Sequence, residues 1–269
     1  MQTLSDQEAM KQGVIGDGDL AIPTPPKFDD PQQERIYAKQ RLAAAFRVFA
    51  MHGFDDGLAG HISVRDPVRN DCFWVNPVGL HFSKIKSSDL VLLDHDGKTV
   101  EGKALVNNAA FAIHSRLHHN RADVNAICHA HTRYGRSFSV LGQPLEPITQ
   151  DACIFYENHA IYDSFQGVVH EVSEGDQIAA AMGDKSCAIL QNHGILTTGT
   201  SVDVAAALFV QMEGVCETQL LAQAAGKLTK IPPEIAIKTR NFNGSDFVMW
   251  GYFQPMYQQV LDADPSFLD

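Results

Sequence analysis

The sequence lacks long apolar runs. No hydrophobic stretch approaches the ~18 residues that a membrane-spanning helix requires. The segment from Met1 to Asp19 also lacks the basic start and apolar centre of a secretory signal peptide. We therefore expect a cytoplasmic protein that does not insert into a membrane.

Positive charge is scarce as well. Lys and Arg number 21 against 32 for Asp and Glu, and the formal net charge is −11. Nucleic-acid backbones and anionic membrane surfaces are bound by clustered Lys and Arg side chains. The charge balance therefore argues against nucleic acid and membrane as partners.

Paired cysteines are also missing. The chain has five cysteines, an odd number without close pairing, and several of them fall in apolar runs: Cys72, Cys128, Cys153, Cys187 and Cys216. This usage is typical of reduced, buried thiols in a cytosolic protein rather than of a disulfide framework.

What the chain does have is enough apolar sequence for a substantial core. Apolar residues make up 45% of its 269 residues and charged residues 20%. Residues 1–28 are rich in Gly, Asp and Pro and are predicted to form a flexible tail or arm. Residues 29–269 show no internal repeat or boundary and are predicted to form a single domain. Its last segment, 232–269, begins with two prolines, and we expect it to be irregular and to pack at a subunit interface.

Helical and strand-like segments alternate along this domain. Helices are expected to begin near Pro31, Asn107, Thr132, Ser173 and Ser201. Between them lie short β-branched or alternating runs around residues 62, 73, 92, 100 and 127, and a strand–turn–strand over 187–198. Because hairpins occur among the strands, we predict an α/β fold, a three-layer α/β/α sandwich with a mixed, largely antiparallel central sheet.

The most informative stretch runs from Val124 to His131. It reads as a buried strand ending in His-Ala-His, and the two-residue period of a strand places His129 and His131 on one side. A third histidine, His193, lies next to Gly194 between two apolar strand-like runs. Each histidine alone would more readily be structural. The two motifs together favour a metal site. Cys128 points to the opposite face of the strand and is not expected to be a ligand.

These residues also resemble the class II aldolase/adducin family over about residues 34 to 225. The motifs that carry the resemblance are Gly60-His61-Ile62-Ser63-Val64-Arg65, Asn76-Pro77-Val78-Gly79, Arg121 to Ala126 followed by His129-Ala130-His131, and Gln191-Asn192-His193-Gly194. The resemblance implies an α/β/α fold and a homotetramer with active sites at subunit interfaces. It also implies a divalent metal ion (Zn, Fe(II) or Mn) bound by His129, His131 and His193, and a small-molecule substrate.

The sequence departs from the family's sugar-phosphate aldolases at three places. Fuculose-phosphate aldolase has a Ser-Ser-Glu whose glutamate binds metal and moves protons, and Asn108-Ala109-Ala110 occupies those positions here. The phosphate-holding Ser-Gly-Asn becomes Ala59-Gly60-His61, and Thr-Pro-x-Gly becomes Asn76-Pro77-Val78-Gly79. These changes favour an unphosphorylated, bulkier and more apolar substrate.

A proton shuttle must then come from elsewhere. Asp151 falls near the position of a catalytic aspartate in the family's ribulose-phosphate epimerases, although it could instead cap a loop. His61 replaces a substrate-contacting Asn. Glu157, in the polar loop Tyr156-Glu157-Asn158-His159, is the weaker candidate because such groups often only hydrogen-bond to each other. His118 and His119 read as solvated residues at a helix end without a role.

Three functions remain open. The first is a divalent-metal-dependent lyase of the aldolase or decarboxylase type, acting on an unphosphorylated oxo- or hydroxy-acid. The second is a non-haem Fe(II) oxygenase with three histidine ligands that acts on an aromatic 2-oxo or 2-hydroxy acid, because a few such antibiotic-pathway enzymes resemble class II aldolases. The third is an adducin-like, non-catalytic binding module, which the retention of all three histidines disfavours.

Overall fold

The computed structural model describes residues 23–167 and 171–269, so most of the predicted tail over 1–28 lies outside the described residues. Its central element is one eight-stranded sheet in the order β4-β3-β2-β1-β5-β8-β7-β6. The strands are β1 (His61–Arg65), β2 (Cys72–Val75), β3 (Val91–Asp94), β4 (Thr99–Glu101), β5 (Ala126–Ala130), β6 (His159–Tyr162), β7 (Cys187–Leu190) and β8 (Gly194–Gly199). Only β6 and β7 pair in parallel, so the predicted mixed, largely antiparallel sheet is confirmed.

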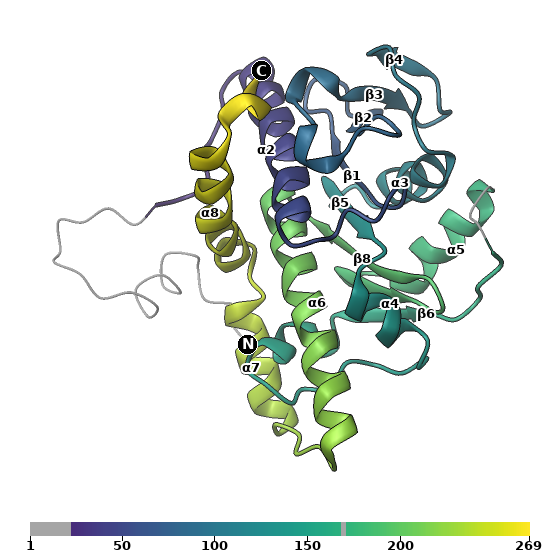
Figure 1. The fold of residues 1–269 in the computed structure, drawn as a ribbon, viewed down its shortest axis with the longest axis vertical. Helices are drawn as coiled ribbons and strands as arrows, with labels where there is room; N and C mark the ends of the chain where they lie inside the picture. Colours follow the sequence, from purple (N-terminus) through teal and green to yellow (C-terminus); the bar gives the residue numbers. More distant parts are fainter. Residues whose placement is uncertain (1–22, 168–170) are drawn as a thin grey trace, which may run out of the picture.

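Helices cover both faces of this sheet (Figure 1). The helices α3 (Asn108–Asn120) and α5 (Val172–Met182) pack on one face, and α2 (Pro31–Met51), α4 (Arg133–Ser139) and α6 (Val202–Ala225) pack on the other. Side chains along β5 point alternately to the two faces of the sheet, so this strand contributes to the hydrophobic core on each face. Ile127 packs with α3 and α5, and Cys128 packs beneath α6. The predicted α/β/α sandwich is confirmed.

The helix starts follow the capping residues that the sequence contains. The Asp30 carboxylate accepts a hydrogen bond from the Gln32 N–H, and Pro31 occupies the first helical position of α2. The Ser201 hydroxyl accepts a hydrogen bond from the Val204 N–H at the start of α6. These caps compensate N–H groups that have no partner within the helix.

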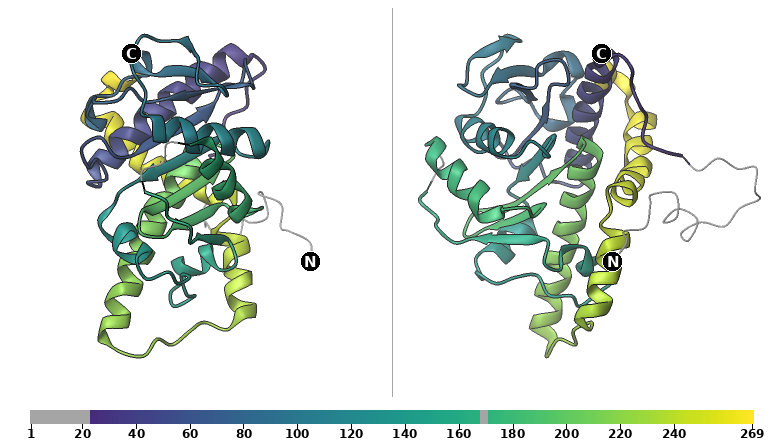
Figure 2. Two further views of the ribbon diagram at one scale, coloured as in Figure 1. Left: turned by 90° about the vertical axis from the view of Figure 1, so that its right-hand side faces the viewer. Right: turned by 180° about the vertical axis from the view of Figure 1, so that it is seen from behind.

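The C-terminal segment is not irregular, contrary to the prediction. It forms α7 (Pro233–Asn243) and α8 (Asp246–Ala263), followed by the short helix η4 (Pro265–Leu268). Pro233 was misread as a helix breaker, although proline is well tolerated at the first helical position. Helix α8 lies beside α2 and α6 and buries Met249, Trp250 and Phe253, so tertiary packing stabilises a sequence of modest helix propensity (Figures 1 and 2). Packing at a subunit interface stays a prediction.

The strand β6 was not predicted. The sequence reading placed Tyr156 to His159 in a polar loop, but His159 begins a four-residue strand that pairs in parallel with β7. Glu157 lies in the preceding turn with a left-handed φ of 58°. So short a run after a polar turn carries no readable periodicity.

The composition led us to expect buried, reduced cysteines and no membrane-spanning helix. All five cysteines are buried and unpaired, and burial raises the pKa of the Cys128 and Cys187 thiols. In the described part of the chain, no helix combines the length and the apolar character needed to cross a membrane.

Candidate metal centre

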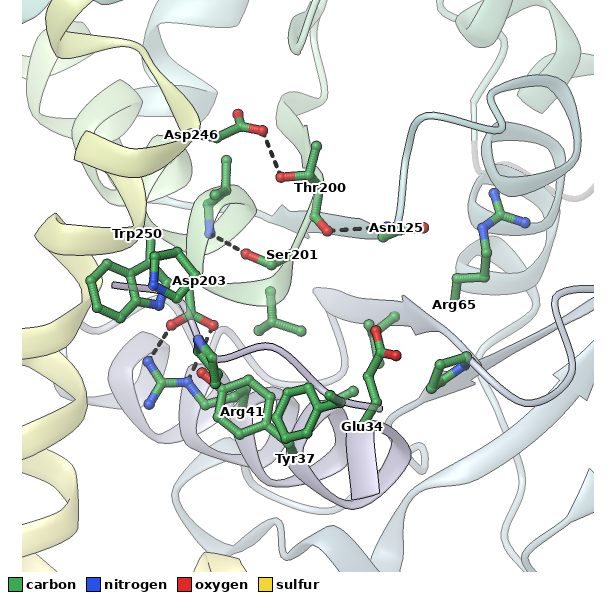
Figure 3. A pocket seen from close by; sticks show the side chains of 18 of the residues that line it. Glu34, Tyr37, Arg41, Arg65, Asn125, Thr200, Ser201, Asp203, Asp246 and Trp250 are labelled. Carbon is green, nitrogen blue, oxygen red and sulfur yellow. Dashed lines mark hydrogen bonds and ion pairs between the residues drawn. The ribbon is translucent and has the colours of Figure 1, made fainter. Parts of the chain in front are cut away.

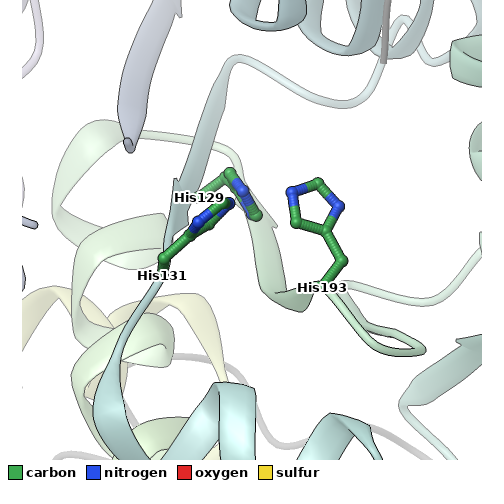
Figure 4. A group of neighbouring side chains, drawn as sticks. All are labelled: His129, His131 and His193. Carbon is green, nitrogen blue, oxygen red and sulfur yellow. The ribbon is translucent and has the colours of Figure 1, made fainter. Parts of the chain in front are cut away.

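Three histidines converge at one end of the central strands. His129 is on β5, His131 follows that strand directly, and His193 lies in the turn between β7 and β8. One ring nitrogen from each lies within 4.8 Å of the others, and the ring centroids are 4.7 to 5.1 Å apart. Figure 4 shows His129 and His131 on one side facing His193 across a shared space. The predicted convergence of these side chains is therefore found, although they are far apart in sequence.

The turn that carries His193 is tight. Leu190 and Gly194 are paired across the hairpin, and the His193 N–H donates to the Leu190 carbonyl at 3.0 Å. Asn192 has a left-handed φ of 59°, a conformation that Asn tolerates better than most residues. The Asn-His-Gly motif therefore encodes the turn that presents His193.

Two glycines let this turn and β1 approach β5 closely. A Cβ atom on Gly194 would lie 3.3 Å from the Ala130 carbonyl oxygen and 3.6 Å from His129 Cε1. A Cβ atom on Gly60, whose φ is +98°, would lie 3.3 Å from the His129 carbonyl oxygen. A side chain at either position would push against the backbone that holds His129.

A buried carboxylate anchors the chain just after His131. Glu213 on α6 accepts hydrogen bonds from the Thr132 hydroxyl, from the Tyr134 N–H at 2.8 Å and from the Gly135 N–H at 2.7 Å. These donors form the N-terminus of α4, where a negative charge is favourable. The anchor ties the segment that carries His131 to α6.

The ring orientation of His129 is set by the backbone. Its Nδ1 lies 2.9 Å from the Ile195 carbonyl oxygen, and because a carbonyl only accepts, Nδ1 must be the donor. A neutral His129 therefore has its lone pair on Nε2. A backbone or carboxylate partner on one nitrogen is the usual support for a histidine that binds metal through the other.

All three imidazoles are held in the neutral form that metal binding requires. Burial, together with the neighbouring histidines, lowers the pKa of His129 well below its usual value. Burial and His131 lower the pKa of His193 to about 4, and burial and Arg136 lower the pKa of His131. No carboxylate belongs to this group among residues 23–167 and 171–269. Three neutral nitrogen donors fit Zn, Fe(II) or a similar transition metal better than Mg or Ca.

Of the three predicted catalytic residues, only His61 lies beside this cluster. His61 is paired with His129 across β1 and β5, its ring centroid lies 5.0 Å from that of His129, and it is buried. Asp151 is exposed at the start of the short helix η3 (Asp151–Phe155), which packs against α6 and α7. Glu157 is also exposed, with its carboxylate 3.7 Å from Arg240 Nη1. Catalytic roles for these residues stay predictions.

His159, the neighbour of Glu157, has a structural explanation. Its Nδ1 donates to the Phe155 carbonyl at 2.6 Å, and its Nε2 accepts from the Leu145 N–H at 3.0 Å. Both ring nitrogens are thus used by the backbone.

Three further buried polar residues, which the sequence analysis did not single out, continue from His61: His114, Ser63 and His118. Hydrogen bonds join them in one chain, and His118, expected to be solvated, is only 1% exposed. The reading of His118 was therefore wrong. The sequence spacing could have indicated this group. His114 and His118 are four residues apart and share one face of α3, and Ser63 shares the face of His61 on β1.

A separate cavity of about 480 Å³ lies at the opposite ends of the same strands (Figure 3). Arg65, Asn125 and Thr200, which end or flank β1, β5 and β8, line it. Its buried Arg41 is paired with Asp203. None of the three converging histidines lines this cavity.

The fold is an α/β/α sandwich, and its three histidines come from a strand end and a hairpin turn. Together these features define a class of domains that can bind a single metal ion. The profile of the Class II Aldolase and Adducin N-terminal domain matches residues 40–220. The chain belongs to this class II aldolase/adducin family.

Similar proteins have several named activities. The chain is 44% identical over 93% of both chains to "Decarboxylase NovR" of Streptomyces niveus. It is 43% identical to "4-hydroxy-3-prenylphenylpyruvate oxygenase/4-hydroxy-3-prenylbenzoate synthase" of Streptomyces roseochromogenus subsp. oscitans, covering 93% of this chain and 91% of the other. A solved structure, "L-fuculose 1-phosphate aldolase from Glaciozyma antarctica PI12", has a TM-score of 0.85 and 40% identity, covering 91% of this chain and 96% of the other.

Proposed function

We propose that the protein is a metal-dependent enzyme that cleaves the carbon–carbon bond next to the carboxylate of an unphosphorylated, aromatic 2-oxo or 2-hydroxy acid, with iron(II) and dioxygen. The single observation that carries this proposal is the cluster of three histidines, which includes no carboxylate from the described part of the chain. The names of the two Streptomyces relatives, a decarboxylase and an oxygenase acting on an arylpyruvate, support the substrate class and the use of dioxygen.

The three histidines would hold the cation, each through one ring nitrogen. When bound, the cation supplies Lewis-acid polarisation of a carbonyl or, as iron(II), redox chemistry with dioxygen. Neutral ligands leave its double charge available to an anionic substrate. For a 2-hydroxy acid the overall reaction balances as acid plus dioxygen giving the acid one carbon shorter, carbon dioxide and water. For a 2-oxo acid it balances as acid plus dioxygen giving carbon dioxide and the acid one carbon shorter, which carries the second oxygen atom as a hydroxyl group.

Groups around the cluster suit an aromatic acid. The Phe165 ring lies 6.5 Å from that of His193 and is 48% exposed, so it can cover an aromatic substrate. Arg136 is close enough to His131 to lower its pKa, and it pairs with Asp56 at 3.0 Å on the surface. Its guanidinium offers a partner for the substrate carboxylate.

The test is oxygen consumption by iron(II)-loaded protein supplied with aromatic 2-oxo and 2-hydroxy acids. We expect dioxygen uptake matched by release of carbon dioxide, and loss of both in His131→Ala. The control is His81→Ala, which alters an exposed histidine paired with Asp55 outside the cluster. Failure to consume dioxygen with any of these acids, despite bound iron, would contradict the oxygenase proposal.

A second candidate is a non-oxidative lyase, the first reading of the sequence. It is favoured by the aldolase from Glaciozyma antarctica, which is 40% identical to this chain. Release of an aldehyde or of carbon dioxide under argon, without dioxygen, would identify this activity. The adducin-like binding module is disfavoured because all three histidines are present and converge.

Asp151 and Glu157 are proposed as further proton-transfer groups. Both are exposed in the single chain and lie outside the three-histidine group, so we propose that they act where a neighbouring subunit meets this site. Asp151→Asn is expected to lower turnover with metal content unchanged, and full turnover in this variant would exclude the role.

A further inference from the structure

The cavity at the strand ends opposite the metal centre is a second place where a small molecule can bind. Its volume of about 480 Å³ lies within the range of small-molecule sites in proteins. It is enclosed by the chain before α2, by the N-terminal parts of α2, α6 and α8, and by residues that end or flank β1, β5 and β8 (Figure 3). None of the three converging histidines lines it, so a molecule bound there does not occupy the metal centre.

One part of the cavity lining is aromatic. Phe28, just before α2, packs against Tyr37 with ring centroids 5.1 Å apart, and on α8 the Phe247 ring lies 6.1 Å from that of Trp250. All four rings line the cavity. Phe28, Tyr37 and Phe247 are only partly buried, so they keep accessible ring surface. Aromatic rings attract flat apolar groups, and their electron-rich faces also attract cations.

The two arginines that line the cavity already have partners. Arg41 is 4% exposed, and its guanidinium pairs with the Asp203 carboxylate and donates to the Gln254 side chain. Arg65 donates to four backbone carbonyls, three of them in the last part of α3 and the loop after it. Figure 3 shows its guanidinium pointing away from Glu34. Neither guanidinium is therefore directed at an anionic ligand in the cavity.

The carboxylates at the cavity are less completely paired. Glu34 and Asp246 both line it, both are exposed, and neither forms an ion pair within the described part of the chain. Asp246 accepts a hydrogen bond from the Thr200 hydroxyl at 2.7 Å. Figure 3 shows the Glu34 side chain pointing from α2 into the cavity. Together with the net charge of −11, these carboxylates give the cavity a potential that attracts cations.

We propose that this cavity binds an organic cation, a protonated amine carried on an aromatic or similarly flat apolar group. The ring of the ligand packs against Phe28 and Tyr37, its ammonium group pairs with the Glu34 carboxylate, and Asp246 adds to the negative potential. The ligand is a second one, separate from the substrate at the metal centre, so the inference does not depend on the proposed function.

An aromatic acid of the kind proposed for the metal centre fits the same rings. Its carboxylate, however, would lie near Glu34 and Asp246, and like charges repel. Charge rather than shape therefore separates the two kinds of ligand.

Isothermal titration calorimetry with three probes of similar shape tests this preference. Phenethylamine is a cation, 2-phenylethanol is neutral and 3-phenylpropionate is an anion. We expect about one phenethylamine to bind per chain, 2-phenylethanol to bind about fivefold more weakly, and 3-phenylpropionate not to displace the amine. His193→Ala should leave the affinity for phenethylamine unchanged, which places the binding away from the metal centre.

Two variants test the residues of the cavity. Glu34→Gln removes the charge with almost no change of shape, so it should weaken phenethylamine about fivefold and leave 2-phenylethanol unchanged. Glu234→Gln is the matched control, because Glu234 is also exposed in the first turn of a helix but does not line the cavity. Phe28 lies outside the hydrophobic core, and Phe28→Leu should weaken both probes because it removes a ring face.

The proposal would be overturned by a lack of saturable phenethylamine binding, by equal affinity for the amine and the alcohol, or by equal affinity for the amine in Glu34→Gln and the wild type. Loss of phenethylamine binding in His193→Ala would assign the amine to the metal centre and would overturn it as well.

Discussion

At the scale of single residues, the notable feature is how many imidazoles are buried and neutral. His114 and His118 both have a pKa well below that of an exposed histidine, chiefly because burial disfavours the charged form. In the unfolded chain the same groups titrate near their usual value of 6.5. Below that pH the unfolded state binds more protons than the folded state, so acid favours unfolding.

We therefore predict that metal-free protein loses stability as the pH falls below about 6.5, and that these histidines cause no further change above that pH. Each such histidine contributes about 1.4 kcal/mol per pH unit until the pH reaches its lowered pKa. Denaturant unfolding at a series of pH values measures this slope. His118→Phe should reduce the slope of stability against pH by the contribution of one histidine, and His119→Phe should leave the slope unchanged. A slope that is unchanged in His118→Phe would refute this explanation.

The residues of the metal site were predictable because a strand end and a tight turn fix their direction locally. His129 and His131 follow the strand period, and the Asn-His-Gly turn places His193. The series of hydrogen bonds that joins His114, Ser63 and His118 was not predictable in the same way. It joins a helix face to a strand face, and only the packing of α3 on β1 brings the two together.

At the scale of elements, the contact between α4 and α6 holds the segment that follows His131. Glu213 is 6% exposed, and its carboxylate accepts three hydrogen bonds from the start of α4. In Glu213→Gln one acceptor oxygen becomes an NH₂ donor, so backbone N–H groups lose their partner. We expect the free energy of unfolding to fall by about 2–3 kcal/mol.

Chemical denaturation of Glu213→Gln and of a matched control tests this anchor. The control is Glu234→Gln, the same substitution at an exposed position in the first turn of α7, which should change stability by less than about 0.5 kcal/mol. Metal affinity should also fall in Glu213→Gln, because His131 is less firmly held. Equal stability of the two variants would show that this contact is not an anchor.

Apart from β6, the strands, and the α-helices up to α6, could be predicted because their periodicity and capping residues agree with their packing. The two C-terminal helices could not. Pro233, Pro255 and a run of aromatic residues lower local helix propensity, and α8 is stabilised by burying Trp250 and Phe253 against α2 and α6. Such tertiary stabilisation leaves no local signal in the sequence.

At the scale of the whole molecule, the sheet brings the ends of β1, β5 and β8 to one site. The alternation of strands and helices was enough to predict the layers. The homotetramer with active sites between subunits stays a prediction, and light scattering of the purified protein would test it.

We expect the three imidazoles, which are far apart in the sequence, to bind one divalent cation. Titration of cobalt(II) into metal-free protein, followed by its visible spectrum, measures this binding directly. We predict saturation at about one cobalt per chain, loss of this site in His193→Ala, and no change in His81→Ala. No spectral response, or binding that persists unaltered in His193→Ala, would contradict the account.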